Sequence, residues 1–285
     1  MKNSNGLFSK LKNVTLIALF SAAIPAAEAA DNTLTSGNSQ ALIDFGNSTG
    51  MHSWTINGQN QLAQQWFWFG LGNAAQNPLN TMPAVVVSQT RADFVTATYT
   101  DLAHQFSIQI DYTLAGGQTG GNDWTSDITE NIKIVNNNLS GDLNIRFYQY
   151  SDFNLGANPS GDSVSISQSG VFFTKATQTQ GASRVSETID IPLANRAEAG
   201  LTTYPVNTLA HLQSGSAYDL NNNLSAGPGD ATWALQWNFD IGAGQSQDVI
   251  KDKRLSVEPV PEPSLIAFAS LGLFGLVCRW RRSAA

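Results

Sequence analysis

The chain has 285 residues, and its 15 Lys and Arg against 22 Asp and Glu give a formal net charge of −7. Nine basic and 20 acidic residues lie between residues 31 and 259, without a basic cluster that could collect phosphate groups, so nucleic acid is not an expected partner. The one cysteine, Cys278, lies near the C-terminus, which excludes a disulfide scaffold, a thiolate metal site and a cysteine nucleophile from the body of the protein.

The first 30 residues have the order of features that is typical of a secretory signal peptide. Lysines open the segment, a short apolar run follows at residues 14–20, and Ala27, Ala29 and Ala30 form a small-residue cleavage site. Because a membrane-spanning helix needs about 20 apolar residues, this run is too short to cross a bilayer comfortably. We therefore expect residues 1–30 to be removed on export, with an uncleaved N-terminal anchor as the alternative.

Residues 31–256 are expected to form one all-β domain, an antiparallel, jelly-roll-like β-sandwich. In residues 233–239 every second side chain is large and apolar, so such a strand would have one buried and one wet face. Turns rich in Gly and Asn separate strands of this kind, as in antiparallel sheets packed face to face. Further strands are expected at residues 93–100, 105–114, 128–135, 143–150, 163–168 and 185–191, and one short helix at 206–213.

Three tryptophans, Trp66, Trp68 and Trp124, are candidates for sugar binding. Trp66 and Trp68 would project from the same face of a strand, and aromatic side chains commonly line ligand sites. Residues 65–69 can also be read as a central strand that is apolar on both faces, and most tryptophans are largely buried. The sequence leaves both interpretations open.

Asp152, Asn154 and Asp162 are weak candidates for a calcium site, because they place oxygen ligands in or near loops and hard cations prefer oxygen. Such residues also form turns, which is the alternative. Apart from calcium, the sequence implies no cofactor. Carboxylates such as Asp101 and Asp111 could pair across a sheet as the two acids of a glycoside hydrolase, but nothing marks one pair above the rest. We therefore predict that the body is not an enzyme.

Residues 257–285 are expected to form a membrane-sorting tail with three parts. A proline-rich motif at 260–264 precedes an uncharged apolar stretch at 265–278, and a basic stop follows at 279–282. As a transmembrane helix the apolar stretch would be about 21 Å long, short of the roughly 30 Å hydrocarbon core. The basic stop would stay in the cytoplasm, which leaves the body outside. The residues concerned are Pro261, Glu262 and Pro263 in the motif and Arg279, Arg281 and Arg282 in the stop.

This tail resembles the PEP-CTERM sorting domain, which exosortases recognise in Gram-negative bacteria that make exopolysaccharide. The resemblance implies that Pro261, Glu262 and Pro263 are the recognition motif, that an exosortase is a partner, and that the inner membrane is a transient anchor. An ordinary single-pass anchor after a proline linker is the alternative. Residues 66–69 and 147–156 are similar to segments of an uncharacterised group of exported, β-rich PEP-CTERM proteins, which implies a sandwich fold and indicates no particular activity.

Together these features predict an exported, exosortase-processed protein of the cell surface or extracellular matrix. Its precursor would be anchored in the inner membrane, and the mature body, non-catalytic, would be associated with exopolysaccharide or a biofilm. Two alternatives remain, a carbohydrate-binding module and a polysaccharide-active hydrolase. The first requires exposed tryptophans in one patch, and the second requires two converging carboxylates, one of them with a displaced pKa.

Overall fold

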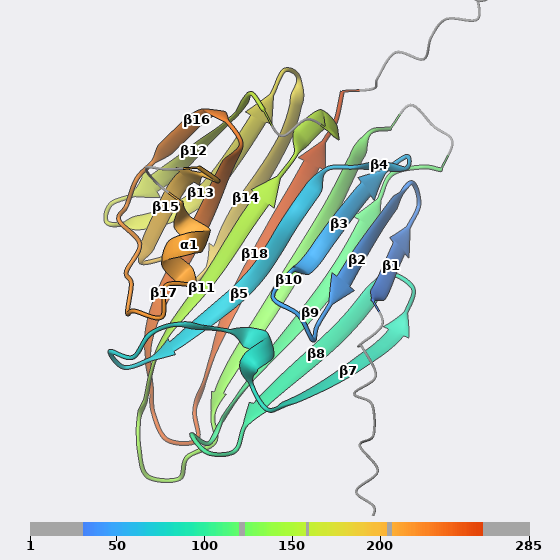
Figure 1. The fold of residues 1–285 in the computed structure, drawn as a ribbon. Coiled ribbons are helices and arrows are strands. Elements are labelled where there is room, and N and C mark those ends of the chain that lie inside the picture. Colours follow the sequence, from blue (N-terminus) through green and yellow to red (C-terminus); the bar gives the residue numbers. More distant parts are fainter. Residues whose placement is uncertain (1–30, 120–122, 158–159, 204–206, 259–285) are drawn as a thin grey trace, which may run out of the picture.

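The computed structural model describes residues 31–258 with three gaps, at 120–122, 158–159 and 204–206. The expected signal peptide at 1–30 and the sorting motif, apolar stretch and basic stop beyond residue 258 lie outside the described residues. Within the described part, no helix is long and apolar enough to span a bilayer. The chain folds into two nine-stranded β-sheets that lie face to face (Figure 1).

Sheet A is the front layer of Figure 1. Its neighbouring strands are antiparallel apart from a short parallel contact between its third and fourth strands. In spatial order its strands are β1 (Asn32–Ser36), β2 (Ser39–Asp44), β3 (Gly50–Ile56), β5 (Leu62–Leu71), β11 (Leu143–Phe153), β17 (Ala231–Ile241) and β15 (Arg196–Leu201), with β4 (Gln59–Asn60) beside β3 and β6 (Asn77–Pro78) beside β5.

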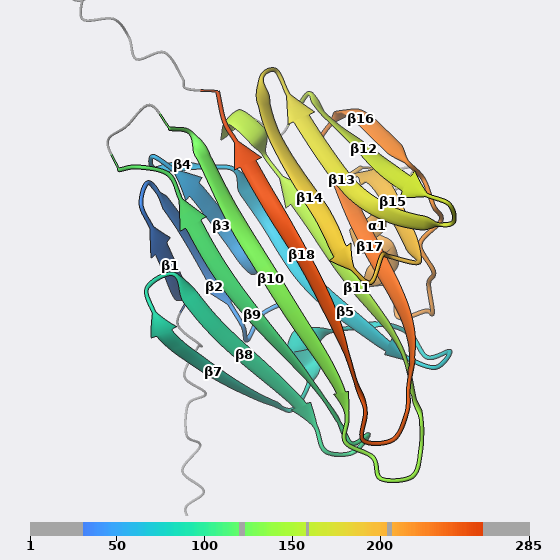
Figure 2. The same ribbon diagram turned by 180° about the vertical axis from the view of Figure 1, so that it is seen from behind.

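Sheet B is the layer that faces the reader in Figure 2, and its strands are antiparallel. In spatial order they are β16 (Ser225–Gly229), β12 (Asp162–Ser169), β13 (Phe172–Gln180), β14 (Ser183–Ile191), β18 (Ser246–Ser256), β10 (Thr125–Asn136), β9 (Phe106–Gly116), β8 (Phe94–Asp101) and β7 (Ala84–Arg91). Three short helices, η1 (Leu79–Thr81), η2 (Leu155–Ala157) and α1 (Thr208–Leu212), complete the described elements.

Alternation of side chains along the strands produces the sandwich. In β9, Phe106, Ile108, Ile110, Tyr112 and Leu114 are buried, and the residues between them are only partly covered. The buried faces of the two sheets meet in an aromatic interior, where the ring centroids of Phe67 and Phe147 lie 5.4 Å apart. The predicted all-β, antiparallel sandwich is thus confirmed.

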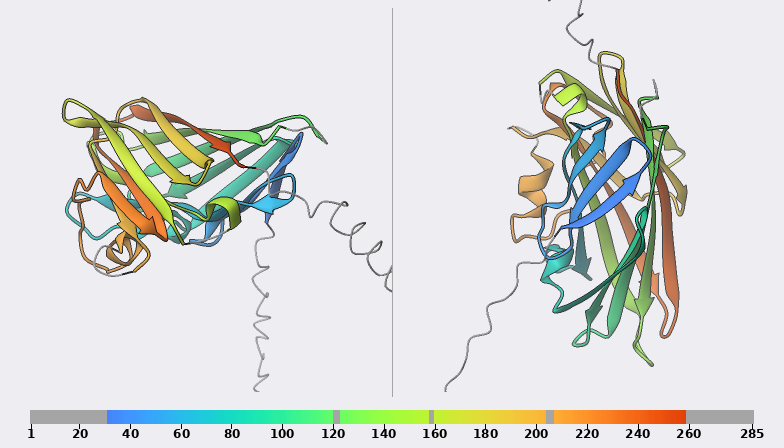
Figure 3. Two further views of the ribbon diagram at one scale, coloured as in Figure 1. Left: turned by 90° about the horizontal axis from the view of Figure 1, so that it is seen from above. Right: turned by 90° about the vertical axis from the view of Figure 1, so that its right-hand side faces the viewer.

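The segment that carries α1 covers the outer face of sheet A (Figure 3). The side chain of Asn207 caps α1 by accepting a hydrogen bond from the Ala210 amide at 2.9 Å, within the range 206–213 expected to be helical. The segment is tied down by the Tyr148 hydroxyl, which donates to the Tyr218 carbonyl at 2.8 Å, and by the Tyr218 hydroxyl, which donates to Glu198 at 2.6 Å. The part of this face around Tyr148 is therefore covered.

Four charged side chains are wholly buried between the sheets and form the ionic cluster: Glu130 of β10, Glu187 of β14, and Lys251 and Lys253 of β18. Lys253 Nζ donates to Glu130 Oε1 at 2.6 Å and lies 3.3 Å from Glu187 Oε1. Lys251 Nζ lies 3.1 Å from Glu187 Oε1 and also contacts Glu130. Each buried carboxylate thus meets two cations.

Sheet A completes this cluster from across the interior. Gln149 Nε2 and Trp233 Nε1 donate to Glu187 Oε2, at 2.7 and 2.9 Å. Lys251 Nζ lies 5.2 Å from the centroid of the Phe67 ring, a cation–π distance. The cluster therefore fixes β18 against strands of both sheets.

Candidate functional site

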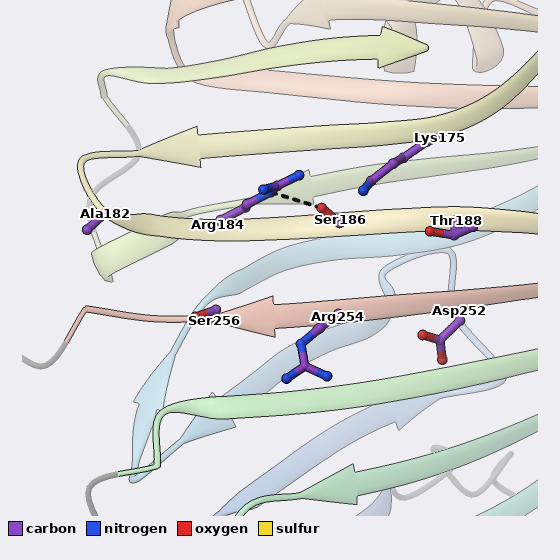
Figure 4. A pocket seen from close by; sticks show the side chains of 8 residues that line it. All are labelled: Lys175, Ala182, Arg184, Ser186, Thr188, Asp252, Arg254 and Ser256. Carbon is purple, nitrogen blue, oxygen red and sulfur yellow. Dashed lines mark hydrogen bonds between the residues drawn. The ribbon is translucent and has the colours of Figure 1, made fainter. Parts of the chain in front are cut away.

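A groove of about 460 Å³ lies over β13, β14 and β18 of sheet B (Figure 4). It is on the outer face of the sheet, because Val185, Glu187 and Lys253 on the same strands alternate with its lining residues and point inward, where they are buried. The lining residues are Lys175, Ala182, Arg184, Ser186, Thr188, Asp252, Arg254 and Ser256.

Strand register brings these residues together from distant parts of the chain. β14 and β18 run antiparallel, so that Arg184 lies opposite Ser256, and Ser186 opposite Arg254. On the other side of β14, Lys175 of β13 lies opposite Thr188. Two arginines, a lysine and several hydroxyl groups thus share one hollow.

Two of the three cations of the groove have no acidic partner among the described residues. Within the described part of the chain, neither Lys175 nor Arg184 has an acidic side chain within salt-bridge distance, whereas Arg91 has Asp93 at 2.8 Å. Arg184 Nε donates instead to the Ser186 hydroxyl at 3.0 Å (Figure 4). The groove is therefore locally positive.

The other two charged residues of the groove, Arg254 and Asp252, are also consistent with a positive groove. Arg254 is 63% exposed and lies 3.6 Å from Asp127, an ion pair that solvent weakens strongly. Asp252, the carboxylate of the groove, accepts a hydrogen bond from the Thr129 hydroxyl at 2.9 Å. An anion entering the groove would thus meet three cations and one carboxylate already occupied by a donor.

The three candidate tryptophans do not form an exposed platform. Trp66 and Trp68 are fully buried, and Trp124 is partly buried against the core. Trp68 packs edge-on against Tyr150 at 6.2 Å, and Trp66 packs edge-on against Tyr99 at 6.3 Å. Because the rings are covered, the structure corrects the idea of a platform at Trp66 and Trp68.

The calcium candidates lie at the end of the sandwich where β11 ends and β12 begins. Asp152 and Asp162 are close enough to act on each other electrostatically, and Asp230 joins them from the turn before β17. Burial first, and then the charges of Asp230 and Asp162, raises the pKa of Asp152 to about 7. For Asp162 burial is the largest influence; although hydrogen bonds from the Gln178 side chain and the Leu155 backbone oppose it, burial and the charge of Asp230 raise the pKa of Asp162 to about 7. Asn154 follows at the end of β11 with a buried, unpartnered Oδ1.

The C-terminal residues 259–282 match the PEP-CTERM protein-sorting motif. The chain carries an exosortase sorting signal. This confirms the recognised motif around Pro261, Glu262 and Pro263, and it implies an exported protein with a membrane-anchored precursor and an exosortase as a partner. No curated protein matches the chain.

Solved structures of several carbohydrate-related enzymes resemble the sandwich. A bacterial glucoamylase complexed with acarbose matches with a TM-score of 0.58 at 11% identity, over 86% of this chain and 35% of that one. A polysaccharide lyase matches with a TM-score of 0.45 at 11% identity, over 79% of this chain and 34% of that one. A heparan sulfate lyase from Pedobacter heparinus matches with a TM-score of 0.38 at 8% identity, over 83% and 37%. The chain thus spans about a third of each matched protein.

The glucoamylase match contradicts the prediction that the protein is not an enzyme. That prediction rested on the lack of a catalytic motif in the sequence, whereas the sandwich has a fold that occurs within a glucoamylase. At 11% identity the likeness shows the fold alone. The reaction, substrate and catalytic residues of that enzyme therefore do not transfer to this chain.

Sequence reasoning missed the groove residues Lys175, Arg184 and Arg254. Each lies in a strand with ordinary alternation, and a single Lys or Arg on a wet face is typical of any β protein. The available signal was the placement of cations and hydroxyls at alternate positions, as in Arg184, Ser186 and Thr188. That signal becomes informative only when the strand order is known.

Proposed function

We propose that the protein is exported, cut at its C-terminal motif by an exosortase, and holds an acidic polysaccharide at the cell surface or in the surrounding matrix. In this proposal residues 1–30 are the export signal, 31–256 the sandwich and 257–285 the sorting tail. The observation that carries the proposal is the cationic groove of Lys175, Arg184 and Arg254 on an otherwise acidic protein.

The chemistry of the groove suits carboxylate or sulfate groups on sugars. Guanidinium groups bind such anions through two parallel hydrogen bonds, and a lysine adds a point charge. The hydroxyls of Ser186, Thr188 and Ser256 can donate to, or accept from, the hydroxyls of a sugar ring. Since the rest of the surface is acidic and repels a polyanion, the groove would also determine where the polymer lies.

A second candidate function is cleavage of the polysaccharide, and the fold shared with part of a glucoamylase supports it. That enzyme was solved in complex with acarbose. Cleavage would need an acid and a base that reach the sugar. In the described part of the chain, the groove contributes Asp252 as its carboxylate. Binding and turnover are therefore to be measured on the same samples.

The test is calorimetric titration of the purified protein with polygalacturonate, and with dextran as a neutral polymer. We expect polygalacturonate to bind and dextran not to bind, with an affinity that falls as salt rises, because exposed charges are screened. The double variant Lys175→Ala/Arg184→Ala should bind about tenfold more weakly, which corresponds to about 1.4 kcal/mol. Arg91→Ala removes an exposed cation that pairs with Asp93 and should bind as the wild type does.

Equal binding of dextran, or an unchanged affinity in the double variant, would remove the groove from the proposal. An assay of new reducing ends in the same mixtures tests the second candidate. Turnover that survives the loss of Lys175 and Arg184 would place the reacting groups elsewhere on the sandwich.

A further inference from the structure

The end of the sandwich near η2 gathers carboxylates from three segments of the chain. Asp152 lies opposite Thr232 at the end of β11, and Asp162 opens β12 opposite Gly229. Asp230 lies between these two partners in the turn that leads into β17. Since β11 belongs to sheet A and β12 to sheet B, the carboxylates meet where the two layers approach each other.

Several oxygens at this end are buried without a hydrogen-bond partner. Asp162 is fully buried, and neither of its carboxylate oxygens has a hydrogen-bond partner of good geometry, although the Gln178 side chain and the Leu155 backbone lie close enough to lower its pKa. Oδ1 of Asp152 and Oδ1 of Asn154 are buried and unpartnered in the same way. Asp230 also has a buried, unpartnered Oδ1, and its Oδ2 accepts a hydrogen bond from the Thr202 hydroxyl at 2.7 Å. Buried polar atoms without a hydrogen-bond partner are rare in folded proteins, because each one lowers the stability of the protein.

An amide side chain supplies an independent observation. Gln178 of β13 is fully buried, and its side chain lies beside the carboxylate of Asp162. Its Nε2 donates to the Phe153 carbonyl at 2.6 Å, and its Oε1 is buried without a partner. Since the unpartnered atoms from these residues are all acceptors, and no Lys or Arg of the described chain forms an ion pair with them, a cation would satisfy them.

We propose that Asp152, Asn154, Asp162 and Gln178 bind a calcium ion, with Asp230 adding negative charge beside it. Calcium takes six to eight oxygen ligands in flexible geometry, and carboxylates and side-chain amides are among its usual ligands. Magnesium fits less well, because it demands a near-ideal octahedron.

The proposed site combines carboxylate ligands with amide ligands, which agrees with the distribution of potential metal-binding side chains. No group of three or more His, Cys, Asp or Glu side chains in the described residues is placed to hold a metal ion. The proposed site uses two carboxylates and two amides instead, and the remaining ligands would be water or carbonyl oxygens, as calcium allows. The bound ion would join the end of β11 to the start of β12, and so one sheet to the other.

The test is thermal unfolding of the purified protein after EDTA treatment, with calcium chloride or magnesium chloride added at constant ionic strength. We expect calcium to raise the Tm by about 5–10 °C at a hundredfold excess over the Kd, and magnesium to raise it much less. Asp162→Asn keeps the shape of the side chain and removes its charge, so it should abolish the response. Asp248→Asn removes the same charge from the outer face of sheet B and should retain it.

Circular dichroism establishes that Asp162→Asn is folded, and calorimetric titration with calcium provides a second measurement. A heat of binding in the wild type that is absent in Asp162→Asn would support the site. No shift of the wild-type Tm together with no heat would overturn the proposal, and so would an equal response in Asp162→Asn. Because the polysaccharide groove is on another part of sheet B, its affinity is expected to be the same with and without calcium.

Discussion

Two regions of the sandwich bury carboxylates, and they do so in opposite ways. In the ionic cluster, Glu130 and Glu187 each meet the ammonium groups of Lys251 and Lys253, and both lysines come from one strand, β18. At the acidic end, no Lys or Arg of the described chain pairs with the carboxylates, and several of their oxygens have no partner. In the first region the buried carboxylates have cationic partners within the described part of the protein, and in the second region they do not.

This difference separates a structural role from a binding role. A compensated cluster needs nothing from outside, and removing any one of its charges leaves the others uncompensated. A cluster of buried carboxylates without cationic partners lowers the stability of the ligand-free protein, and a bound cation would restore that stability. The same substitution, loss of one buried charge, should therefore destabilise one region and stabilise the other.

The largest effect is expected in the ionic cluster. Lys253→Met removes the donor to Glu130 and leaves two buried carboxylates with one lysine, so the free energy of unfolding should fall by about 3–5 kcal/mol. Urea unfolding followed by circular dichroism measures this change. The double variant Lys253→Met/Glu130→Leu removes a neutral pair and should recover most of the loss, because apolar replacements of a complete pair are often tolerated. If the double variant were less stable than Lys253→Met, the cluster would not be acting through charge compensation.

A smaller effect of opposite sign is expected at the acidic end. At pH 8 and without calcium, Asp162 is ionised, since its pKa is raised to about 7. Asp162→Asn should then increase the free energy of unfolding by about 1–3 kcal/mol, because the new amide can donate to the unpartnered oxygens of Asp152 and Gln178. The gain should shrink below pH 7, where the wild-type carboxyl holds a proton, and saturating calcium should reverse it. A loss of stability in calcium-free buffer at pH 8 would mean that this carboxylate is already satisfied within the protein.

Much of the fold could be predicted from the sequence, although not all of it. The alternation at residues 128–135 and 233–239 led correctly to the strands β10 and β17. The face of β17 that was expected to be wet is nevertheless buried at Ala234 and Gln236. The interpretation of residues 65–69 as a central strand apolar on both faces was also correct, since Gln65 to Gly70 of β5 are buried. The other strands before residue 91 were not predicted.

The sites were less predictable, because each depends on pairing between distant segments. Asp152, Asn154 and Asp162 were identified from the sequence as residues in or near loops, but the contributions of Gln178 and Asp230 depend on where β13 and the β16–β17 turn lie. Lys251 and Lys253 were missed as buried groups, since alternation rules assign charged residues to the wet face. Their burial is possible only because two glutamates face them from neighbouring strands.

A solvent-exposed carboxylate should show the smallest effect, which sets the scale for the two buried regions. Burial alone would raise the pKa of Asp219, but the hydrogen bond from Gln236 and the charges of Arg196 and Arg146 outweigh it and lower the pKa. A lowered pKa in the folded state means that the stabilisation is present at neutral pH and is lost as the pH falls below about 4. Since the side chain of Asp219 is 46% exposed, Asp219→Asn should cost no more than about 1 kcal/mol at pH 7. Urea unfolding at pH 7 and pH 3 measures both values, and the difference between the two proteins should be smaller at pH 3. A cost at pH 7 as large as that of Lys253→Met would show that burial does not distinguish these carboxylates, and the contrast between the two regions would lose its basis.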